Sequence, residues 1–317
     1  MKIIFMGTPD FAVPFFSAIL SDKNHEIAAV FTQVPKKSGR GLAINNSPIY
    51  NAAQQENIPI YTPISLKNEA TIELIQSIDA DIIVVVAYGF ILPQQILCAK
   101  HYGCVNVHPS LLPKYRGAAP MQHTILNGDT ESGVCIIKMD TGMDTGDIIA
   151  SEKFSIAHDI QYPELTKICT KIGSKLLLHV LNNIEALKPM PQSERASFAP
   201  KISSEHSKID WRNSASKIDC QIRALTPRPG VYFEYCGEKI KILSSNVVRT
   251  NIYSNETNSI LVPPTTIAPG TIIDDQLSVM CGDGNVLKIM DLQKPGKKSM
   301  SSDAFLRGNH IPVNTIL

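Results

Sequence analysis

The side chains best suited to chemistry lie in one short segment near the middle of the chain. Asn106 and His108 are two residues apart and are followed by Pro109. If the preceding apolar run is a β-strand, residues at this spacing point to the same face of a sheet. The proline also favours an extended backbone at His108. We therefore expect an amide and an imidazole to project together from the end of a strand.

A second polar segment follows a later apolar run. Residues 140–147 contain three aspartates and two glycines, in the order Asp-Thr-Gly-Met-Asp-Thr-Gly-Asp. In α/β sheets, ligands bind beyond the carboxyl ends of the strands. We therefore expect this loop at the same edge of the sheet as Asn106 and His108.

An amide, an imidazole and a carboxylate together suit the transfer of an acyl group to an amine. The Asn106 amide can donate a hydrogen bond to a carbonyl oxygen that gains negative charge, which is worth about 10²–10³ in rate. His108 can supply a second donor when protonated, or move the proton from the amine to the leaving nitrogen. Asp144 would either favour the charged form of His108 by Coulomb attraction or hold a water that relays the proton. Taken alone, the Asn-x-His motif also fits a hydrogen-bonded turn, and residues 140–147 also fit a turn or a cation-binding loop.

The segments that must position these residues alternate between strand and helix patterns. Residues 162–184 carry a helical stripe of apolar side chains. Short, mostly apolar segments that are typical of strands occupy 2–6, 27–31, 81–87, 104–107 and 134–139. This alternation predicts an α/β fold, a doubly wound (Rossmann-like) and mostly parallel sheet with both faces covered by helices. Gly7-Thr8-Pro9 lacks the spacing of a dinucleotide-binding fingerprint.

The pattern changes near residue 189. Around residues 189–204 the periodic pattern breaks into Pro, Ser, Gln and Lys, and we interpret residues 190–207 as a linker. Beyond them, one helical segment and several short strand-like segments, including 270–274, predict a small antiparallel β-barrel. Since chains of this length usually divide, we expect a catalytic domain over 1–189, the linker, and a second domain over 208–317.

Composition narrows the class of protein further. The 317 residues carry 30 basic and 29 acidic side chains, and the part from Lys201 onward is mildly positive, with 14 basic and 11 acidic residues. That imbalance fits either a polyanionic partner or ordinary solvated surface. The seven cysteines form no C-x-x-C pair, and no leader or membrane-spanning apolar run is evident, so we expect a reducing, cytoplasmic location. His and Cys show no metal-ligand spacing, so we expect no metal.

Taken together, three segments resemble the folate-dependent formyltransferases. They are 106–113, 116–120 and 140–146, and the similarity extends over nearly the whole chain, including 6–12 and 209–230. The resemblance implies that Asn106, His108 and Asp144 form the catalytic set. It also implies that 10-formyltetrahydrofolate is the formyl donor, used as a co-substrate. The implied acceptor is the α-amino group of methionine on initiator tRNA.

The resemblance also implies binding residues. Folate contacts are expected from Ser110, Leu111, Leu112 and Pro113, and from the chain at Ala87, Tyr88, Gly89 and Asp140. The second domain resembles an oligonucleotide-binding (OB-like) barrel. Contacts to tRNA are expected from Lys36, Lys37 and Arg40 on a flexible loop over 33–47, and from Lys294, Lys297, Lys298 and Arg307 near the end of the chain. The protein is expected to act as a monomer.

Three other functions stay open at this point. An amino-sugar-nucleotide formyltransferase shares both domains and the same three residues, although so small an acceptor needs no basic loop at 36–41. A purine-pathway formyltransferase would not need the domain beyond the linker. A non-catalytic RNA-binding module would not need Asn106, His108 and Asp144 together.

Overall fold

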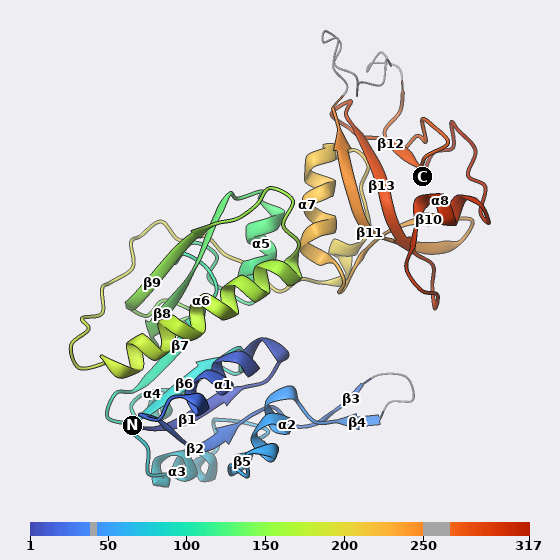
Figure 1. Cartoon of the computed structure of the whole chain (residues 1–317). Helices are drawn as coiled ribbons and strands as arrows, with labels where there is room; N and C mark the ends of the chain where they lie inside the picture. The colour runs from blue at the N-terminus through green and yellow to red at the C-terminus, as the bar shows by residue number, and fades with distance from the viewer. Residues whose placement is uncertain (39–42, 250–266) are drawn as a thin grey trace. The chain divides into compact units, whose positions relative to one another are not determined.

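The computed structural model describes residues 1–38, 43–249 and 267–317. The chain forms two compact units (Figure 1). The first comprises Met1–Pro120, Glu131–Ser155 and Leu165–Pro200, and the second comprises Met121–Thr130, Ile156–Glu164 and Lys201–Leu317. The second unit thus includes two short segments from the first half of the chain.

A seven-stranded mixed sheet forms the centre of the first unit. Its spatial order is β5-β2-β1-β6-β7-β8-β9. The strands are β1 (Lys2–Gly7), β2 (Glu26–Phe31), β5 (Ile60–Tyr61), β6 (Ile82–Val86), β7 (Cys104–His108), β8 (Glu131–Lys138) and β9 (Ile148–Ser155). The first five strands in this order run parallel, whereas β8 and β9 are antiparallel to their neighbours. The predicted Rossmann-like, mostly parallel sheet is confirmed, and the half-exposed edge strand β9 is an addition to it.

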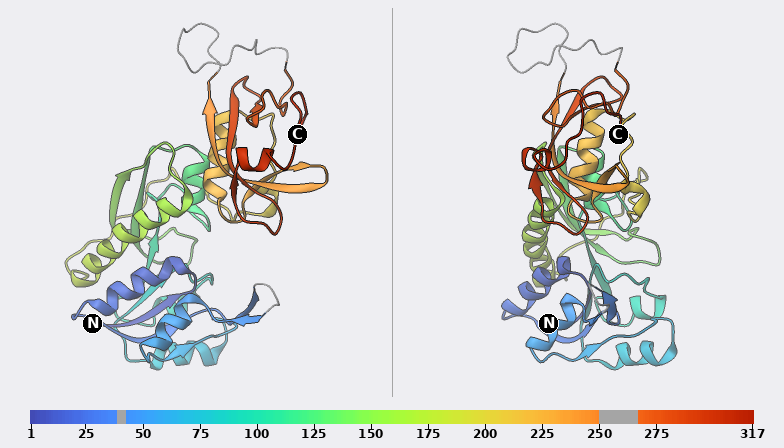
Figure 2. Two further views of the ribbon diagram at one scale, coloured as in Figure 1. Left: turned by 45° about the vertical axis from the view of Figure 1, so that its right-hand side comes forward. Right: turned by 90° about the vertical axis from the view of Figure 1, so that its right-hand side faces the viewer.

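Helices cover both faces of this sheet (Figure 2). They are α1 (Val13–Ser21), α2 (Pro48–Gln55), α3 (Glu69–Ser77), α4 (Gln94–Leu97) and α6 (Tyr162–Asn182), with a 3-10 helix at Asp10–Ala12. Side chains of β1 alternate between the two layers. The ring of Phe5 meets Phe16 of α1 edge-to-face, with 5.5 Å between centroids. Ile4 instead packs in a cluster with Ile75 of α3 and Ile96 of α4.

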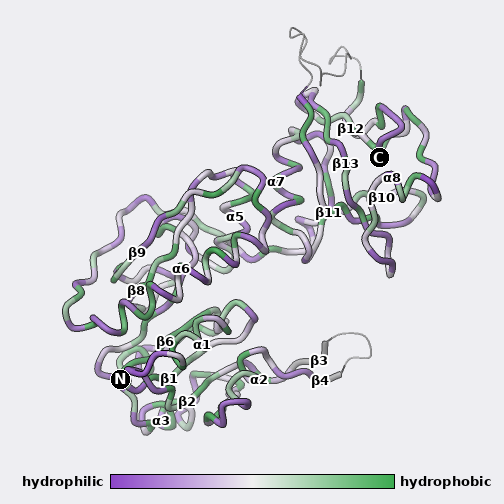
Figure 3. The backbone as a smooth tube through the Cα atoms, viewed as in Figure 1, coloured by the Kyte–Doolittle hydropathy of each residue, from purple (hydrophilic) through white to green (hydrophobic). Residues whose placement is uncertain are grey.

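Local sequence explains how these elements form. Apolar stretches occur both in the sheet and in the helices that pack on it (Figure 3), and β6 is buried at all of its positions. The hydroxyl of Ser47 accepts a hydrogen bond from the Tyr50 amide at 3.0 Å, and Pro48 occupies the first position of α2, where its missing N–H costs nothing. Gly173 lets α6 approach α1, because a Cβ there would lie 2.9 Å from the Phe15 ring.

The second unit is an antiparallel sheet with a long helix against it. The sheet order is β10-β11-β13-β12, and β14 pairs with β13. Register shifts around Ser244 in β11 bend the strand and curl the sheet, as expected of a barrel-type domain. The elements are β10 (Val231–Tyr235), β11 (Glu238–Val248), β12 (Ser278–Met280), β13 (Val286–Gln293), β14 (Met300–Ser301), α5 (Pro120–Leu126), α7 (Ala215–Leu225), α8 (Ser302–Leu306) and a 3-10 helix at Ser204–Ser207.

The strand predicted at 270–274 is wrong. Thr271 and Ile272 form only isolated bridges, to Ile316 and Val279. The Asp274 carboxylate accepts the amide hydrogen of Gln276, which turns the chain after too few residues for a strand.

A buried ion pair links α7 to its surroundings in the second unit. Arg223 Nε lies 2.6 Å from Asp219 Oδ2, and both side chains are less than a tenth exposed. The other Asp219 oxygen accepts from the Ser245 hydroxyl of β11 at 2.8 Å, and Arg223 donates to the Ile160 carbonyl at 3.0 Å. Each charge is therefore compensated by hydrogen bonds as well as by its partner.

We expect Asp219→Ala to lower the free energy of unfolding of the second unit by about 3–5 kcal/mol, because it leaves the Arg223 charge buried without a partner. The single Trp211 lies buried in this unit, so its fluorescence during urea unfolding of the full chain measures the effect. Asp210→Ala is the matched control, since that carboxylate pairs with Arg212 on the exposed surface and should matter little. Equal losses in the two variants would contradict this account of the buried pair.

Candidate active site

Strand β7 carries two of the three expected catalytic side chains. Asn106 is half-buried, and His108 is buried with 3% of its surface exposed. Both side chains reach Asp144, which agrees with the same-face geometry predicted from their spacing.

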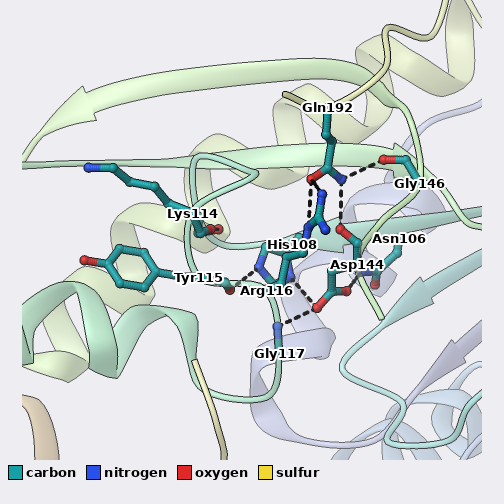
Figure 4. Close-up of polar contacts among 10 residues, drawn as sticks. Asn106, His108, Lys114, Tyr115, Arg116, Gly117, Asp144, Gly146 and Gln192 are labelled. Atoms are coloured by element: carbon teal, nitrogen blue, oxygen red, sulfur yellow. Dashed lines mark hydrogen bonds and ion pairs between the residues drawn. The ribbon is translucent and has the colours of Figure 1, made fainter. Parts of the chain in front are cut away.

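The Asp144 carboxylate lies between these two side chains (Figure 4). Its Oδ1 atom is 3.5 Å from Asn106 Nδ2, and its Oδ2 atom is 3.6 Å from His108 Nδ1. The Gly117 amide donates a shorter hydrogen bond, 2.8 Å, to Oδ2. An amide, an imidazole and a carboxylate thus converge in one place, with only 16% of the Asp144 side chain exposed.

The loop that carries Asp144 reaches the site by a different route from the one expected. Because β8 is antiparallel to β7, Lys138 at the carboxyl end of β8 pairs with Val105 near the start of β7. The loop therefore does not begin at the carboxyl end of a strand parallel to β7, as the prediction assumed, although Asp144 does meet Asn106 and His108 as expected. The loop folds back to bring Asp144 to the end of β7. Gly146 packs directly on Lys138, where a Cβ would lie 1.8 Å from the carbonyl oxygen.

Hydrogen bonds within the loop stabilise this course. The Asp140 carboxylate accepts from the Gly142 amide at 3.0 Å and from the Thr145 hydroxyl at 2.6 Å. Asp144 itself has a left-handed backbone, with φ +54°. Asp140 is exposed but its Oδ1 is committed to its own loop, and its contact with folate stays a prediction.

The loop after β7 fixes the orientation of the imidazole. His108 Nε2 lies 2.9 Å from the carbonyl oxygen of Tyr115. Since a carbonyl only accepts, Nε2 must carry the hydrogen. Burial lowers the pKa of His108, while the Asp144 charge and the Tyr115 carbonyl act in the opposite direction. The expected effect of Asp144 is therefore present, but burial outweighs it.

The sequence interpretation missed Gln192, which it placed in the linker. Its Nε2 donates to the backbone carbonyls of Asp144 and Gly146, each at 2.8 Å. Its Oε1 accepts from Arg116 Nε at 3.1 Å and from Arg116 Nη2 at 2.7 Å. No periodicity or spacing relates residue 192 to residues 116 and 144, so the sequence carries no signal for this contact.

The residues expected to contact folate fall into two groups. Ala87 and Gly89 are exposed just after β6 and have left-handed backbones, with φ of 48° and 86°. The Tyr88 side chain is buried in the core, which raises the pKa of its hydroxyl. The Tyr88 carbonyl accepts from Thr8 and Gln33 side chains, each at 3.1 Å.

Residues 110–113 stabilise the loop after β7 through hydrogen bonds and apolar packing. The buried Ser110 hydroxyl donates to the Lys114 carbonyl at 2.7 Å, and Leu112 packs with Cys135 and Ile137. Leu111 lies against Gly133, where any Cβ would collide with it. The half-buried Pro113 accepts from the Ser197 amide through its carbonyl at 3.2 Å. Contacts between these residues and folate stay a prediction.

The N-terminal cations lie in a short antiparallel ribbon. Strand β3 (Lys36–Ser38) contains Lys36 and Lys37 and pairs with β4 (Ala43–Asn45). The expected flexible loop is therefore wrong for these strand residues. Arg40 lies outside the described residues.

The C-terminal cations differ in their contacts and in their exposure to solvent. Lys294 Nζ pairs with Glu238 at 2.8 Å and donates to Asn309 at 2.9 Å, so its charge is already compensated. Lys297 and Lys298, on the turn between β13 and β14, are exposed, as is Arg307 after α8.

The described parts of the chain hold neither a cluster of metal ligands nor a membrane-spanning helix. Over 1–38, 43–249 and 267–317, no group of three or more His, Cys, Asp or Glu side chains could hold a metal ion. No helix in these same ranges is both long and apolar enough to span a bilayer. The seven cysteines are all free thiols, and five of them are buried.

Known proteins resemble this chain over both units. The family model described as "Formyl transferase" matches residues 1–181, and the model described as "Formyl transferase, C-terminal domain" matches 201–310. The methionyl-tRNA formyltransferase of Rickettsia bellii (strain RML369-C) is 48% identical over 314 residues, which is 99% of this chain and 98% of the relative. That of Rickettsia rickettsii (strain Iowa) is 46% identical over 318 residues and the full length of both.

Solved structures share the fold at lower identity. Methionyl-tRNA formyltransferase from Clostridium thermocellum aligns with a TM-score of 0.56 and 20% identity, over 78% of this chain and 93% of that one. An N-formyltransferase from Helicobacter canadensis, in complex with folinic acid and dTDP-3-aminofucose, aligns with a TM-score of 0.65 and 21% identity, over 93% and 99%. The two matched models and the end-to-end similarity to the Rickettsia proteins show that this chain belongs to the formyl transferase family.

Proposed function

We propose that this chain transfers the formyl group of 10-formyltetrahydrofolate to the α-amino group of methionine esterified to initiator tRNA. The convergence of Asn106, His108 and Asp144 is the observation that carries the chemistry. The choice of acceptor follows the Rickettsia relatives, which are nearly half identical along the whole chain. The Helicobacter canadensis protein is too distant to argue for an amino-sugar acceptor, since likeness at 21% identity extends only to the fold.

In this proposal, Asn106 stabilises the charge that develops on the formyl oxygen. The folate supplies the formyl group and the methionine amine is the nucleophile, so no serine or cysteine nucleophile is needed. A side-chain amide has two N–H donors. Asp144 accepts one of them weakly, at 3.5 Å, which orients the amide and leaves the second donor for substrate.

In this proposal, His108 and Asp144 transfer the proton that the attacking amine releases. Because Nε2–H donates to Tyr115, Nδ1 is the basic atom of the neutral ring, and it faces Asp144 Oδ2 at 3.6 Å. A lone pair beside a carboxylate is unfavourable, whereas an N–H there is favourable, so Asp144 assists Nδ1 in taking up a proton. We assign to them the proton that the amine loses, which then returns to the leaving nitrogen of the folate. Both ring nitrogens already have partners, Nε2 in Tyr115 and Nδ1 in Asp144, which favours this role over that of a second oxyanion donor.

The division of labour between the two parts of the chain is also part of the proposal. Folate is assigned to the backbone at 87–89, to residues 110–113 and to Asp140. The cations of β3 and of the β13–β14 turn are assigned to tRNA, because lysine and arginine neutralise phosphates. This keeps the predicted roles of 1–189 as catalytic domain, 190–207 as linker and 208–317 as OB-like tRNA-binding domain. We place the protein in the cytoplasm as a monomer.

The function itself is tested by formyl transfer from 10-formyltetrahydrofolate to three acceptors. Methionyl initiator tRNA should be formylated, whereas uncharged tRNA and a dTDP-linked amino sugar should not. Preferential formylation of the amino sugar would replace this proposal with the sugar-nucleotide alternative.

Asn106→Ala should lower kcat by about 10²–10³, because it removes one hydrogen-bond donor to the developing oxyanion. The apparent affinity for methionyl-tRNA should change little, since the donor acts on the reacting carbonyl. Steady-state formylation kinetics measure both quantities. Asn51→Ala, at an exposed position of α2, is the matched control and should leave kcat unchanged. Full turnover in Asn106→Ala would remove Asn106 from the chemistry.

The protonation state of His108 makes a prediction about stability. Since burial lowers the folded-state pKa below its ordinary value of 6.5, the unfolded chain binds this proton first as the pH falls. His108 therefore contributes fully to the free energy of unfolding above about pH 7, and this contribution is lost as the pH falls below the unfolded pKa near 6.5. The free energy of unfolding then decreases by up to about 1.4 kcal/mol per pH unit.

Urea unfolding at pH 7.5 and pH 5.5, followed by circular dichroism, measures this difference. The wild-type chain should lose more stability between the two pH values than His108→Gln does, because the variant lacks the titrating group. His25, whose pKa burial also lowers, is common to both proteins and cancels in the comparison. A steeper loss in the variant would mean that Asp144 outweighs burial.

Lys297→Ala combined with Lys298→Ala should weaken tRNA binding by about 3–10-fold and lower the slope of log K against log salt by about 1.4–1.8, as two lost phosphate contacts would. The KM for folate should not change. Lys23→Ala combined with Lys67→Ala removes the same charge from exposed positions of the first unit and serves as the control. Equal losses in both double variants would indicate a general charge effect instead of local contacts.

A further inference from the structure

The segment around Gln192 is more than a connection between the two units. Met190 and Ile148 exchange two backbone hydrogen bonds, at 2.8 and 2.9 Å. Further along, the Arg116 amide donates to the Ser197 carbonyl at 2.9 Å, and the Ala199 amide donates to the Arg116 carbonyl at 2.8 Å. The segment 190–199 is therefore paired at one end with β9 and at the other with the loop after β7.

Gln192 lies within this paired segment, and both its amide oxygen and its amide nitrogen form hydrogen bonds. A guanidinium only donates, so the two Arg116 contacts fix Oε1 on that side. Both Nε2 hydrogens are then directed at the carbonyls of Asp144 and Gly146 (Figure 4). The orientation of the amide follows from obligatory donors and acceptors, and it joins two loops that are far apart in sequence.

One of these loops contains Asp144, and the other donates a backbone hydrogen bond to its carboxylate. Gln192 binds the carbonyl of Asp144 itself, whose left-handed φ of +54° is one that residues other than glycine rarely adopt. It also holds Arg116, the neighbour of Gly117, whose amide donates to Asp144 Oδ2. A left-handed backbone at a residue other than glycine persists only when neighbouring groups hold it. The hydrogen bond from Gln192 to the Asp144 carbonyl does so at the residue that carries the carboxylate.

We infer that Gln192 is a positioning residue of the formyl-transfer site, which keeps the Asp144 carboxylate against Asn106 and His108 through the carbonyls of Asp144 and Gly146. This inference rests on the proposed function for its kinetic consequences, and on the hydrogen-bond geometry alone for its structural ones.

Two substitutions separate the contacts of Gln192. Gln192→Met keeps the length of the side chain and removes every hydrogen bond. Gln192→Glu can still accept from Arg116 but loses both donors. We expect each to lower kcat about 10–100-fold, with the KM for methionyl-tRNA within about threefold of wild type, since small misplacement of reacting groups has effects of this order. Ser193→Ala, at the exposed neighbouring position, should retain full activity.

These kinetics can overturn the inference in two ways. If Gln192→Met keeps kcat within about twofold of wild type, the contacts do not position the site. If Gln192→Glu alone retains full turnover, the bond to Arg116 suffices and the carbonyl contacts are not required.

A double-mutant cycle tests whether the effect passes through Asp144. In an Asp144→Asn background, Gln192→Met should lower the residual turnover by less than about threefold, because residues acting as a unit are not additive. A full additive loss in the double variant would show that Gln192 acts independently of Asp144.

Hydrogen exchange gives a readout that needs no substrate. The Gly117 amide is bonded to the Asp144 carboxylate at 2.8 Å, and the nearby Ala119 amide is bonded to the Ala199 carbonyl at 3.1 Å. In Gln192→Met, exchange of the Gly117 amide should rise at least about tenfold, while that of Ala119 stays within about threefold. An unchanged Gly117, or an equal rise at both amides, would overturn the inference. Failure of the wild-type chain to formylate methionyl-tRNA would instead overturn the proposed function and leave this exchange result to decide the role of Gln192.

Discussion

The placement of one carboxylate governs this site. The Asp144 carboxylate lies beside a buried imidazole, in surroundings where an uncompensated charge is costly. The structure meets that requirement with donors from several segments: the Asn106 amide from β7, the Gly117 backbone from the next loop, and Nδ1 of His108 when it is protonated. The same contacts determine which His108 nitrogen is basic, because Tyr115 takes up Nε2. Charge compensation and acid–base function are therefore two aspects of a single arrangement.

The sheet contributes to this arrangement in two different ways. Its parallel part brings β7 into the middle of the first unit, where apolar strands on one side and helices on both faces make it rigid. In its antiparallel part, β8 runs opposite to β7, so the loop after β8 begins near the start of β7. That loop must fold back to reach His108. The close packing of Gly146 on Lys138 and the Asp140 hydrogen bonds make that return possible. Rigid strands thus present the amide and the imidazole, and a folded-back loop brings the carboxylate.

Several residues that a family resemblance would assign to ligand binding also have structural tasks. Ser110 and Leu112 hold the loop after β7 together, and the Tyr88 ring fills the core behind Ala87 and Gly89. Lys294 is likewise engaged in an ion pair, which leaves the neighbouring Lys297 and Lys298 as the exposed cations of that turn. Substitution of the first group would disturb folding as well as binding. The exposed residues Ala87 and Gly89 and the exposed lysines are therefore the better places to examine ligand contacts.

By itself, the sequence determined the strand-and-helix alternation, the change of pattern near residue 189 and the common face of Asn106 and His108, because these follow from local periodicity and from the geometry of an extended chain. It also indicated Asp144, through the density of polar residues in one loop. Only the tertiary structure decided the direction of β8, the lowered pKa of His108 and the contacts of Gln192. Strand direction depends on which edges pair, a pKa depends on burial, and the contacts of Gln192 join residues separated by 48 and 76 positions along the chain, so no local pattern contains them.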